Sequence, residues 1–218
     1  MKLALVTANL GSFDPAIDNV KQDLPSDVAL TEVRITDKEF PPRKKSMTPR
    51  MQARIVKMHA WQFAPDQDIY LWVDSSCRLA RLDSVVWFLE QLGDKDIAVF
   101  KHNRRNTIQE EADYLKERLE LEAAGKKQKY VLDRYENELI DEQLAEIDPN
   151  GELYASTAFI FKDSQATRKA MKDWWYHTSR YHSIDQLSFT HAIKSLKINV
   201  IQQDYLKCPY LEYVRGKN

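Results

Sequence analysis

The chain of 218 residues is poor in cysteine and glycine, with only Cys77, Cys208 and five glycines. Two isolated cysteines are too few for a disulfide framework or a structural zinc site. The glycines form no GxGxxG, Walker or GxSxG pattern. The absence of these three motifs argues against a dinucleotide-dependent dehydrogenase, a P-loop kinase and an α/β-hydrolase.

The chain also lacks an excess of either charge and any long apolar run. Its 32 Lys and Arg residues against 33 Asp and Glu residues give a formal net charge of −1, which argues against a general nucleic-acid binder. No apolar run approaches the roughly 18 residues of a membrane span. The first apolar stretch is too short for a signal peptide. We therefore expect no nucleic-acid partner, no membrane span and a cytoplasmic location.

What the chain does contain is an alternation of short apolar runs and stretches of helical spacing. The runs predict strands at residues 3–8, 28–33, 69–73, 97–100, 153–161 and 198–201. Helices are predicted at residues 48–63, 84–92, 164–181 and 184–196. A charged stretch at about 107–147 predicts two helices joined at Gly125, closed by a turn at 148–151. The pattern favours one α/β domain over 1–218, with a mainly parallel sheet flanked by helices and this hairpin inserted.

Polar residues follow the predicted strand 69–73 directly, in the order Asp74, Ser75, Ser76. Alternate residues of an extended segment point the same way, so Asp74 and Ser76 could face one ion. Mg²⁺ and Mn²⁺ prefer such oxygen ligands and keep waters or substrate phosphates in their shell. Taken alone, a strand-end Asp more often caps a turn.

A basic stripe lies on the helix predicted at 48–63. Arg50 and Arg54 are one helical turn apart and Lys57 continues the row, so all three can point to one spot. Arginine binds phosphate oxygens through two parallel hydrogen bonds, and lysine adds a point charge. The alternative is an ordinary solvated helix face.

A second polar group, which includes His102, Arg104 and Arg105, follows the predicted strand 97–100. Parallel strands bring their carboxyl ends to one edge of a sheet, where α/β proteins bind ligands. Because polar groups follow two strands, they are expected to meet at one edge of the sheet. This makes a binding site a better interpretation than two unrelated exposed loops.

A third group lies at the start of the helix predicted at 184–196. Ser183 has the character of an N-cap, which places Asp185 and Gln186 in the first turn, where a carboxylate is also favourable for purely structural reasons. The functional alternative directs both side chains into a cleft. Upstream, Trp174 and Trp175 offer one core residue and one face for stacking on a sugar or a base.

The order of these pieces resembles the glycosyltransferase-like domain of plant mucilage- and pectin-related proteins and their bacterial and viral relatives. The matching pieces are VTANLGSFD, RMQARIVKMH, IYLWVDSSCRL, FKHNRRNTIQEEA, LYASTAFIFK, and WW followed by DQLSF. Together they cover most of the chain except residues 115–147.

This resemblance implies a GT-A type fold and the transfer of a sugar from a nucleotide diphosphate donor, expected to be a UDP-sugar, to a carbohydrate acceptor in polysaccharide biosynthesis. It favours retention of anomeric configuration. The family's carboxylate motif holds Mn²⁺ or Mg²⁺ on the diphosphate, and here Ser76 stands where the usual form has a second Asp.

Roles for individual residues follow from the same resemblance. Asp74 with Ser76 would hold the cation, and Arg50, Arg54 and Lys57 would contact the diphosphate. The first loop would receive the nucleoside, where Gly11 permits close backbone approach. Expected nucleoside contacts are Thr7, Ala8, Asn9 and Gly11; expected catalytic residues are His102, Arg105 and Asp185; further substrate contacts are Ser75, Gln186 and Trp175. An inverting enzyme would use Asp185 as a base, whereas a retaining one would use it to bind the sugar.

Two other functions fit parts of the pattern. A nucleotidyltransferase would use a similar scaffold and metal-bound phosphates, although its usual first loop is rich in glycine and lysine, unlike NLGSFD. A non-catalytic carbohydrate- or partner-binding module would use the 107–147 hairpin as its interaction surface, but a solvated helical pair is the simpler interpretation of that segment.

Overall fold

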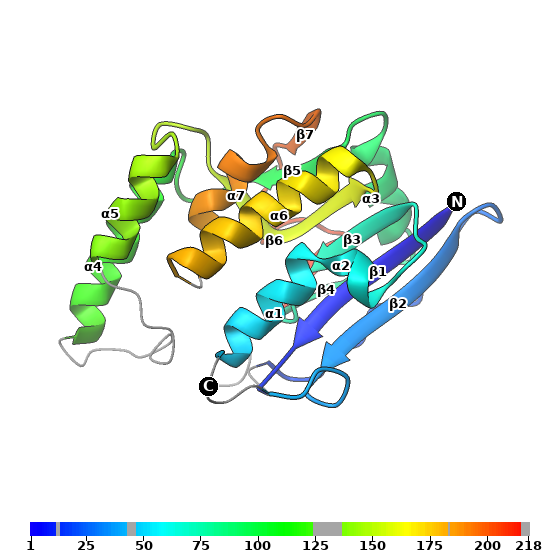
Figure 1. The fold of residues 1–218 in the computed structure, drawn as a ribbon. Coiled ribbons are helices and arrows are strands. Elements are labelled where there is room, and N and C mark those ends of the chain that lie inside the picture. The colour runs from blue at the N-terminus through cyan, green and yellow to red at the C-terminus, as the bar shows by residue number, and fades with distance from the viewer. Residues whose placement is uncertain (12–13, 43–46, 124–136, 183, 215–218) are drawn as a thin grey trace.

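The computed structural model describes residues 1–11, 14–42, 47–123, 137–182 and 184–214, and it is built on a six-stranded sheet in the order β2-β1-β3-β6-β5-β7 (Figure 1). The strands are β1 (Lys2–Asn9), β2 (Ala29–Thr36), β3 (Ile69–Val73), β5 (Ile97–Lys101), β6 (Tyr154–Lys162) and β7 (Ile198–Ile201). Strand β6 runs antiparallel to both of its neighbours, and every other pairing is parallel. Five strands therefore end at one edge, where β6 begins.

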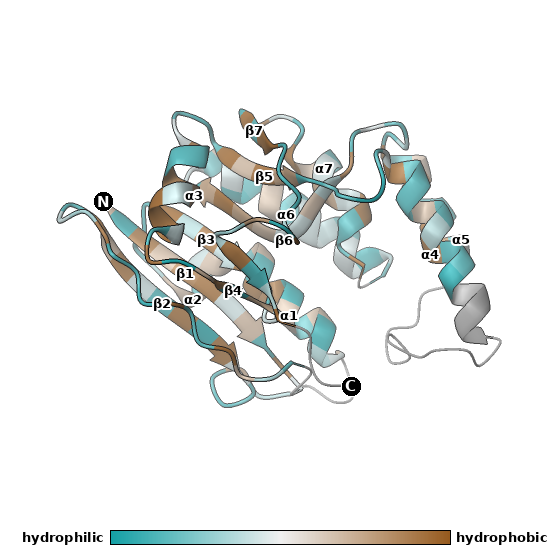
Figure 2. Cartoon of the chain, turned by 180° about the vertical axis from the view of Figure 1, so that it is seen from behind, coloured by the Kyte–Doolittle hydropathy of each residue, from teal (hydrophilic) through white to brown (hydrophobic). Residues whose placement is uncertain are grey.

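Helices cover both faces of this sheet. They are α1 (Pro49–Met58), α2 (Ala60–Phe63), α3 (Ser84–Leu92), α4 (Ile108–Ala123), α5 (Asn137–Glu146), α6 (Gln165–Arg180) and α7 (Gln186–Ile193). One core lies between the sheet and helices α1, α6 and α7, and another lies between the sheet, α3 and the small sheet of β4 (Cys77–Leu79) and β8 (Leu211–Tyr213). The hydropathy colouring agrees, because the central strands are largely apolar (Figure 2). The predicted α/β class with a mainly parallel sheet is confirmed.

Element bounds follow the sequence patterns closely where the patterns are strong. Strands 69–73 and 198–201 and helix 84–92 have the predicted bounds, and the latter is followed by Gly93 at φ 50°. The predicted helix 48–63 is interrupted at His59, whose φ of −129° and ψ of 42° are not helical. The direction of strand β6, antiparallel to its neighbours, had not been predicted. Strands β4 and β8 had not been predicted either, because three-residue strands carry little sequence pattern.

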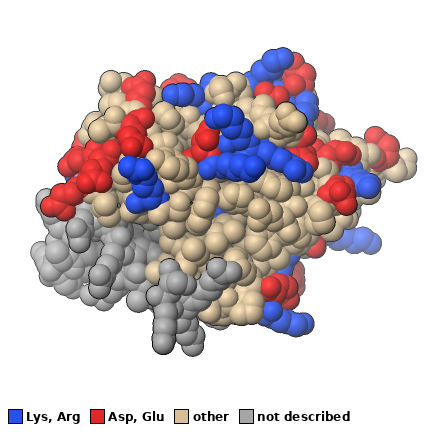
Figure 3. Space-filling view, in the orientation of Figure 1, with Lys and Arg blue, Asp and Glu red and all other residues tan. Residues whose placement is uncertain are grey.

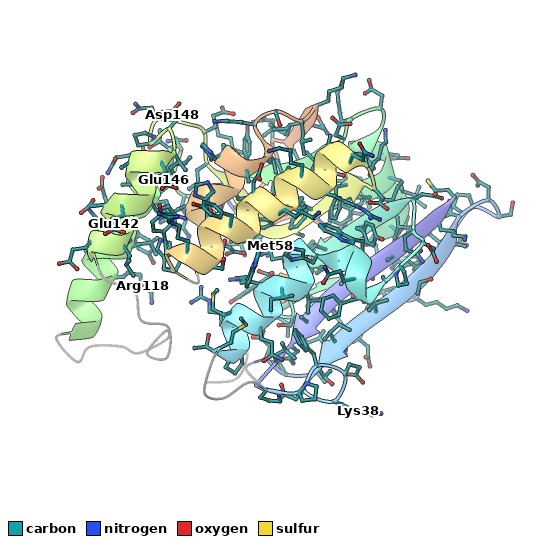
Figure 4. The ribbon with its side chains drawn as sticks, viewed as in Figure 1. Lys38, Met58, Arg118, Glu142, Glu146 and Asp148 are labelled. Carbon is teal, nitrogen blue, oxygen red and sulfur yellow. The ribbon has the colours of Figure 1, made fainter. Side chains whose placement is uncertain are left out.

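The predicted hairpin region contributes two helices that share a separate apolar cluster. Ile108 and Ile140 belong to it, together with Leu187 of α7. Figure 4 shows Glu142 and Glu146 along α5, and a carboxylate oxygen of Glu146 lies 3.8 Å from His177 Nδ1 on α6. The joint predicted at Gly125 lies outside the described residues. The closing turn is present, because the amide of Gly151 donates to the carbonyl of Asp148 at 3.2 Å.

Among the described residues, the structure contains no helix whose length and apolar character would let it cross a membrane.

Helix α6 begins with a capping box. The Ser164 hydroxyl accepts a hydrogen bond from the amide of Thr167 at 3.1 Å, and the Thr167 hydroxyl accepts one from the amide of Ser164 at 3.0 Å. Two amides that the helix itself cannot satisfy are thereby paired.

Replacing this cap gives a first prediction. Ser164→Ala is expected to lower the free energy of unfolding by about 1 kcal/mol, because an amide of the first turn loses its acceptor. Urea unfolding followed by circular dichroism measures the change. The control is Ser179→Ala in the exposed last turn of the same helix, which is expected to change stability little. Equal losses for both variants would contradict the role of the cap.

Candidate active site

A buried lysine joins two carboxylates at the edge where the parallel strands end. The side chain of Lys57 on α1 is fully buried, and its Nζ lies 3.2 Å from Asp74 Oδ1 and 2.8 Å from Asp185 Oδ2. Nη2 of Arg54 lies 3.1 Å from the other oxygen of Asp185. Asp74 directly follows β3, and Asp185 directly precedes α7. Three elements distant in sequence therefore meet in one ion-pair network.

Two tryptophans complete the surroundings of this lysine. Trp72 donates from its indole nitrogen to Asp74 Oδ1 at 2.8 Å, and Trp174 donates to the backbone carbonyl of Asp185 at 2.8 Å. The Lys57 ammonium lies 5.6 Å from the centre of the Trp72 ring and 5.5 Å from that of Trp174. Cation–π attraction of this kind strengthens where water is excluded. The prediction that one of the two adjacent tryptophans is core is confirmed for Trp174, which is fully buried.

The network keeps Asp185 ionised. Complete burial by itself raises the pKa of a carboxyl group, but Arg54 and Lys57 outweigh burial here and hold the pKa of Asp185 below its ordinary value. Both of its oxygens face cations. A carboxylate with a lowered pKa and two cationic neighbours is a poor proton acceptor. This arrangement disfavours the predicted use of Asp185 as a general base and suits a residue that positions the two cations.

The chain after β3 turns at once, contrary to the extended segment assumed from the sequence. The amide of Cys77 donates to the carbonyl of Asp74 at 2.8 Å, which closes a four-residue turn. The alternation that would have directed Asp74 and Ser76 to one ion therefore does not apply. The turn removes the geometric argument for Ser76 as a metal partner of Asp74, and that prediction now rests on the family resemblance alone.

A carboxylate from another part of the chain reaches this turn instead. Asp14, on the loop after β1, accepts a hydrogen bond through Oδ2 from the hydroxyl of Ser75. Asn9 braces the loop, because its Nδ2 donates to the backbone carbonyl of Asp14 at 2.8 Å. Burial raises the pKa of the Cys77 thiol to about 12, with further contributions from Asp74 and Asp14. Both carboxylates therefore lie within electrostatic reach of one side chain.

The oxygens at this turn fit a divalent cation in part. Asp74 Oδ1 already receives bonds from Lys57 and Trp72, whereas no described residue donates to its Oδ2, and its side chain is 28% exposed. Among the described residues, no three His, Cys, Asp or Glu side chains stand close enough to hold an ion by themselves. An oxygen-only set of this size suits Mg²⁺ or Mn²⁺ that keeps substrate phosphates or water in its shell.

The first loop forms part of a small pocket of about 60 Å³ between β1, β2 and the turn after β3. Thr7, Asn9 and Ser75 line it, and Gly11 takes the left-handed φ of 72° that glycine tolerates. The side chain of Ala8, by contrast, is buried in the core on the opposite face of the sheet. Ala8 can therefore contact a ligand only through its backbone.

The loop after β5 is held by its own histidine. Nδ1 of His102 accepts bonds from the amides of Arg104 at 3.3 Å and Arg105 at 3.1 Å, so Nε2 carries the proton of the neutral ring. Burial, with a smaller contribution from the charge of Arg105, lowers the pKa of His102 to about 4. The Arg105 guanidinium pairs with buried Glu111 and lies 4.0 Å from the Tyr114 ring centre. His102 is thus a neutral hydrogen-bond donor at pH 7.

Two further predicted substrate contacts lie outside the network. Gln186 uses its side chain to bind β6, because Oε1 accepts from the Ser156 hydroxyl at 3.2 Å and Nε2 donates to the Tyr154 carbonyl. Trp175 packs edge-on against His59 with ring centres 5.9 Å apart. These contacts give both side chains structural roles. Ser183, predicted as an N-cap, lies outside the described residues.

The ion-pair network of Arg54, Lys57, Asp74 and Asp185 does not coincide with the charged groups on the surface. On the face shown in Figure 3, Lys and Arg gather over α6, and Asp and Glu gather over α5. Of the predicted basic stripe, Lys57 is fully buried and the Arg54 side chain is 13% exposed. The basic stripe is therefore largely covered by the rest of the protein. It is not the solvated helix face given as the alternative in the sequence analysis, and Lys57 is not open to a phosphate.

Comparison with known families decides the relationship of this chain. The model described as "TOD1/MUCI70, glycosyltransferase-like domain" matches residues 43–215. The chain belongs to this family. The resemblance found in the sequence is confirmed, and the α/β class expected with it agrees with the sheet described above. No curated protein matches the chain.

Solved structures of low identity match the chain along most of its length. The galactosyltransferase LgtC, in complex with donor and acceptor sugar analogues, has 7% identity and a TM-score of 0.46, covering 98% of this chain and 87% of that one. A197 from STIV has 10% identity and a TM-score of 0.38, covering 93% and 82%. The 4-diphosphocytidyl-2C-methyl-D-erythritol synthase from Anaerococcus prevotii has 10% identity and a TM-score of 0.39, covering 95% and 90%.

Removing the shared ammonium gives a second prediction. Lys57→Met is expected to lower the free energy of unfolding by about 3–5 kcal/mol, because Asp185 and Asp74 lose a buried counter-charge. Urea unfolding at pH 7 measures it. The control is Lys169→Met, which breaks the exposed pair with Asp173 on α6 and is expected to change stability little. Adding Asp185→Asn to Lys57→Met should recover part of the loss, and purely additive losses would contradict the coupling.

The histidine of the β5 loop gives a third prediction, on pH. Because the pKa of His102 is about 4 in the folded chain against 6.5 ordinarily, the unfolded chain takes up a proton first as the pH falls. The contribution of His102 to stability is therefore complete above about pH 6.5 and is lost towards pH 4. His102→Asn keeps an acceptor for the two amides and should flatten this decline. NMR of the imidazole nitrogens should show the Nε2–H form at pH 6, and a ring that is half-protonated there would contradict the assignment.

Proposed function

We propose that the chain is a glycosyltransferase that moves a sugar from a nucleotide diphosphate donor to a carbohydrate acceptor. Its membership of a glycosyltransferase-like family supports the reaction class. The observation that carries the proposal is the pair Asp74 and Asp185, which one buried ammonium joins at the edge where the parallel strands end. Open α/β sheets bind their ligands at that edge.

A divalent cation, Mn²⁺ or Mg²⁺, would be held by Asp74 through the oxygen that Lys57 and Trp72 leave available. Bound there, the cation would supply positive charge for the diphosphate as it leaves the sugar. Arg50 and Arg54 are proposed to add to that charge from α1. Lys57 is too deeply buried for the diphosphate contact predicted from the sequence. We assign it instead to positioning Asp74 and Asp185.

The remaining parts of the substrate are assigned to neighbouring loops. The nucleoside, proposed to be uridine, would lie by the first loop with Thr7, Asn9 and Gly11. His102 would donate from Nε2 to a hydroxyl of the donor sugar, and Arg105 would hold the loop that presents it. An inverting reaction needs a base at the acceptor hydroxyl. Because both oxygens of Asp185 already face the cations of Lys57 and Arg54, this residue is a poor base, which supports a retaining reaction. A role in polysaccharide biosynthesis and a cytoplasmic location stay predictions.

The decisive experiment incubates the intact chain with a panel of nucleotide sugars, with and without Mn²⁺, and follows the release of nucleotide diphosphate and the thermal shift. Release of the diphosphate with a sugar acceptor is expected. Pyrophosphate released from a nucleoside triphosphate would instead identify a nucleotidyltransferase. Stabilisation by no nucleotide at all would contradict both enzymes and leave a binding module.

Asp74 gives the fourth prediction. Asp74→Ala is expected to abolish the additional thermal stabilisation that Mn²⁺ gives in the presence of the nucleotide sugar, because the cation loses its protein carboxylate. The matched control is Asp68→Ala, an exposed aspartate at the opposite end of the same strand, which should keep the full Mn²⁺-dependent shift. An unchanged shift in Asp74→Ala would refute the role given to Asp74.

A further inference from the structure

We propose that the outer edge of β2 is a homodimer interface, at which a second copy of this chain adds its own β2 in the antiparallel direction. The two copies are related by a twofold axis, so each presents the same strand to the other. The inference is independent of the function proposed above, because it does not involve the Asp74–Lys57 network.

Strand β2 is the last strand of the sheet on one side. It has eight residues and pairs with β1 alone, and among the described helices and strands none lies beyond it (Figure 1). Thr31 and Glu32, in its middle, are exposed. The edge of a sheet presents a row of backbone groups that can pair with another strand. A long, open edge strand is therefore a surface on which a second strand can dock.

The hydrogen bonds of β2 show which of its backbone groups face outwards. The amide of Ala29 donates to the carbonyl of Met1 at 2.9 Å, on the β1 side. In a parallel ladder, alternate residues direct both of their backbone groups to the same neighbour. Residues 31 and 33 therefore also face β1, and residues 30, 32 and 34 direct their amides and carbonyls away from the sheet.

The open part of this edge ends at Thr36. The amide of Thr36 donates to Oε2 of Glu39 at 3.0 Å, and its carbonyl accepts from the amide of Phe40 at 2.9 Å. The outward backbone groups of Leu30, Glu32 and Arg34 form no hydrogen bond within the part of the chain that the structure describes. These groups are available to the backbone of a partner strand.

The charges on β2 select one register for pairing with a second copy. Glu32 and Arg34 are two residues apart, so their side chains lie on the same face of the sheet. An antiparallel pair centred on Val33 puts Glu32 of each copy directly opposite Arg34 of the other. A pair centred on Glu32 would instead place two carboxylates opposite each other. Opposite charges across a ladder stabilise it and like charges destabilise it, so we infer the register centred on Val33.

This register also uses the open backbone groups. Glu32 and Arg34 of opposite copies become hydrogen-bonded pairs, in which each residue exchanges both its amide and its carbonyl bond. The two Val33 residues form the central non-hydrogen-bonded pair, whose side chains approach most closely. The backbone groups of Val33 stay bonded to β1. The ladder inside each copy is therefore left intact.

Apolar side chains beside the edge favour the same partner. Val33 is partly buried against the core on the α1 side of the sheet, as are Phe40 and Phe63. The ring centres of these two phenylalanines are 5.5 Å apart. In the proposed pair, Val33 of one copy packs on Val33 of the other on this side of the sheet, and β-branched pairs of this kind stabilise a ladder.

The antiparallel pairing fixes how the two copies are oriented. Their sheets join into one continuous sheet across the twofold axis. Asp74 follows β3, which runs parallel to β1 and so to β2, and the strand ends that carry Asp74 in the two copies therefore point in opposite directions. Each copy keeps its own candidate site, and neither site needs a residue of the other copy.

Sedimentation equilibrium of the intact chain, from about 1 µM to about 1 mM, measures the association. We expect a reversible equilibrium of monomer and dimer, because a single pair of strands is a small interface. Glu32→Arg should weaken the dimer by about tenfold, since it places like charges opposite each other in both pairs. Adding Arg34→Glu should restore association, because the exchanged charges attract again. Circular dichroism melting confirms that each variant is folded.

The matched control is Asp173→Arg on α6, which changes the net charge by the same amount as Glu32→Arg. Asp173 lies in an exposed ion pair with Lys169, far from β2 in the sheet order because α6 follows β6. It should leave the association constant within about twofold, since distant exposed charges are screened by salt.

A cysteine at the centre of the pair tests the register. Val33→Cys, oxidised with diamide, should give a disulfide-linked dimer, because residues of a non-hydrogen-bonded pair lie within reach of a disulfide. Thr31→Cys is the matched control and should stay largely unlinked, since position 31 faces Ile35 of the other copy. The native Cys77 and Cys208 are both buried. Non-reducing electrophoresis reads out the linked form.

Three results would overturn the inference. One is a chain that stays monomeric over the whole concentration range. Another is a dimer that the folded Glu32→Arg variant does not weaken, which would place the interface elsewhere on the surface. The third is a disulfide-linked dimer of Thr31→Cys without one of Val33→Cys, which would exclude the register that brings Glu32 and Arg34 together.

Discussion

The ammonium of Lys57 is the interaction on which the arrangement at the sheet edge depends. It is fully excluded from water and is shared between a carboxylate that follows β3 and one that precedes α7. A buried charge is costly unless it is paired, and here each partner compensates the other. The two indole groups hold the aspartates in place, because Trp72 donates a hydrogen bond to Asp74 and Trp174 donates one to the backbone carbonyl of Asp185. The network thus ties α1, the sheet and α7 to one another.

The parallel strands explain why the polar residues meet. Strands β1, β3 and β5 end at one edge and send out Asp14, Asp74 and His102 respectively, while β6 enters the sheet there between β3 and β5. The amide of Asp74 donates to the carbonyl of Thr157 on that strand at 2.8 Å. The apolar faces of the sheet are covered by helices on both sides, so the edge is where polar groups can converge.

The fold was largely predictable from local pattern, whereas for the candidate site only the convergence of its residues could be expected from the sequence. Asp74, Lys57, Arg54 and Asp185 do lie close together, because strand ends and helical spacing place them, and their functional roles stay predictions. Their pairing depends on burial, which the sequence does not display: the stripe on α1 looks solvated until α6 covers it. The turn at Cys77 cancelled the alternation expected for Ser76. Asp14 was visible only as a residue of the first loop, since its contact with Ser75 joins distant segments.

The shared lysine also has a consequence for how the chain reaches its native state. Its two carboxylate partners lie on segments that are far apart in sequence, and one of them precedes the helix that completes the core around Trp174. If either segment failed to dock, the buried ammonium would lose one of its two counter-charges. The docking of α7 and the docking of the strand end after β3 therefore stabilise each other through one side chain.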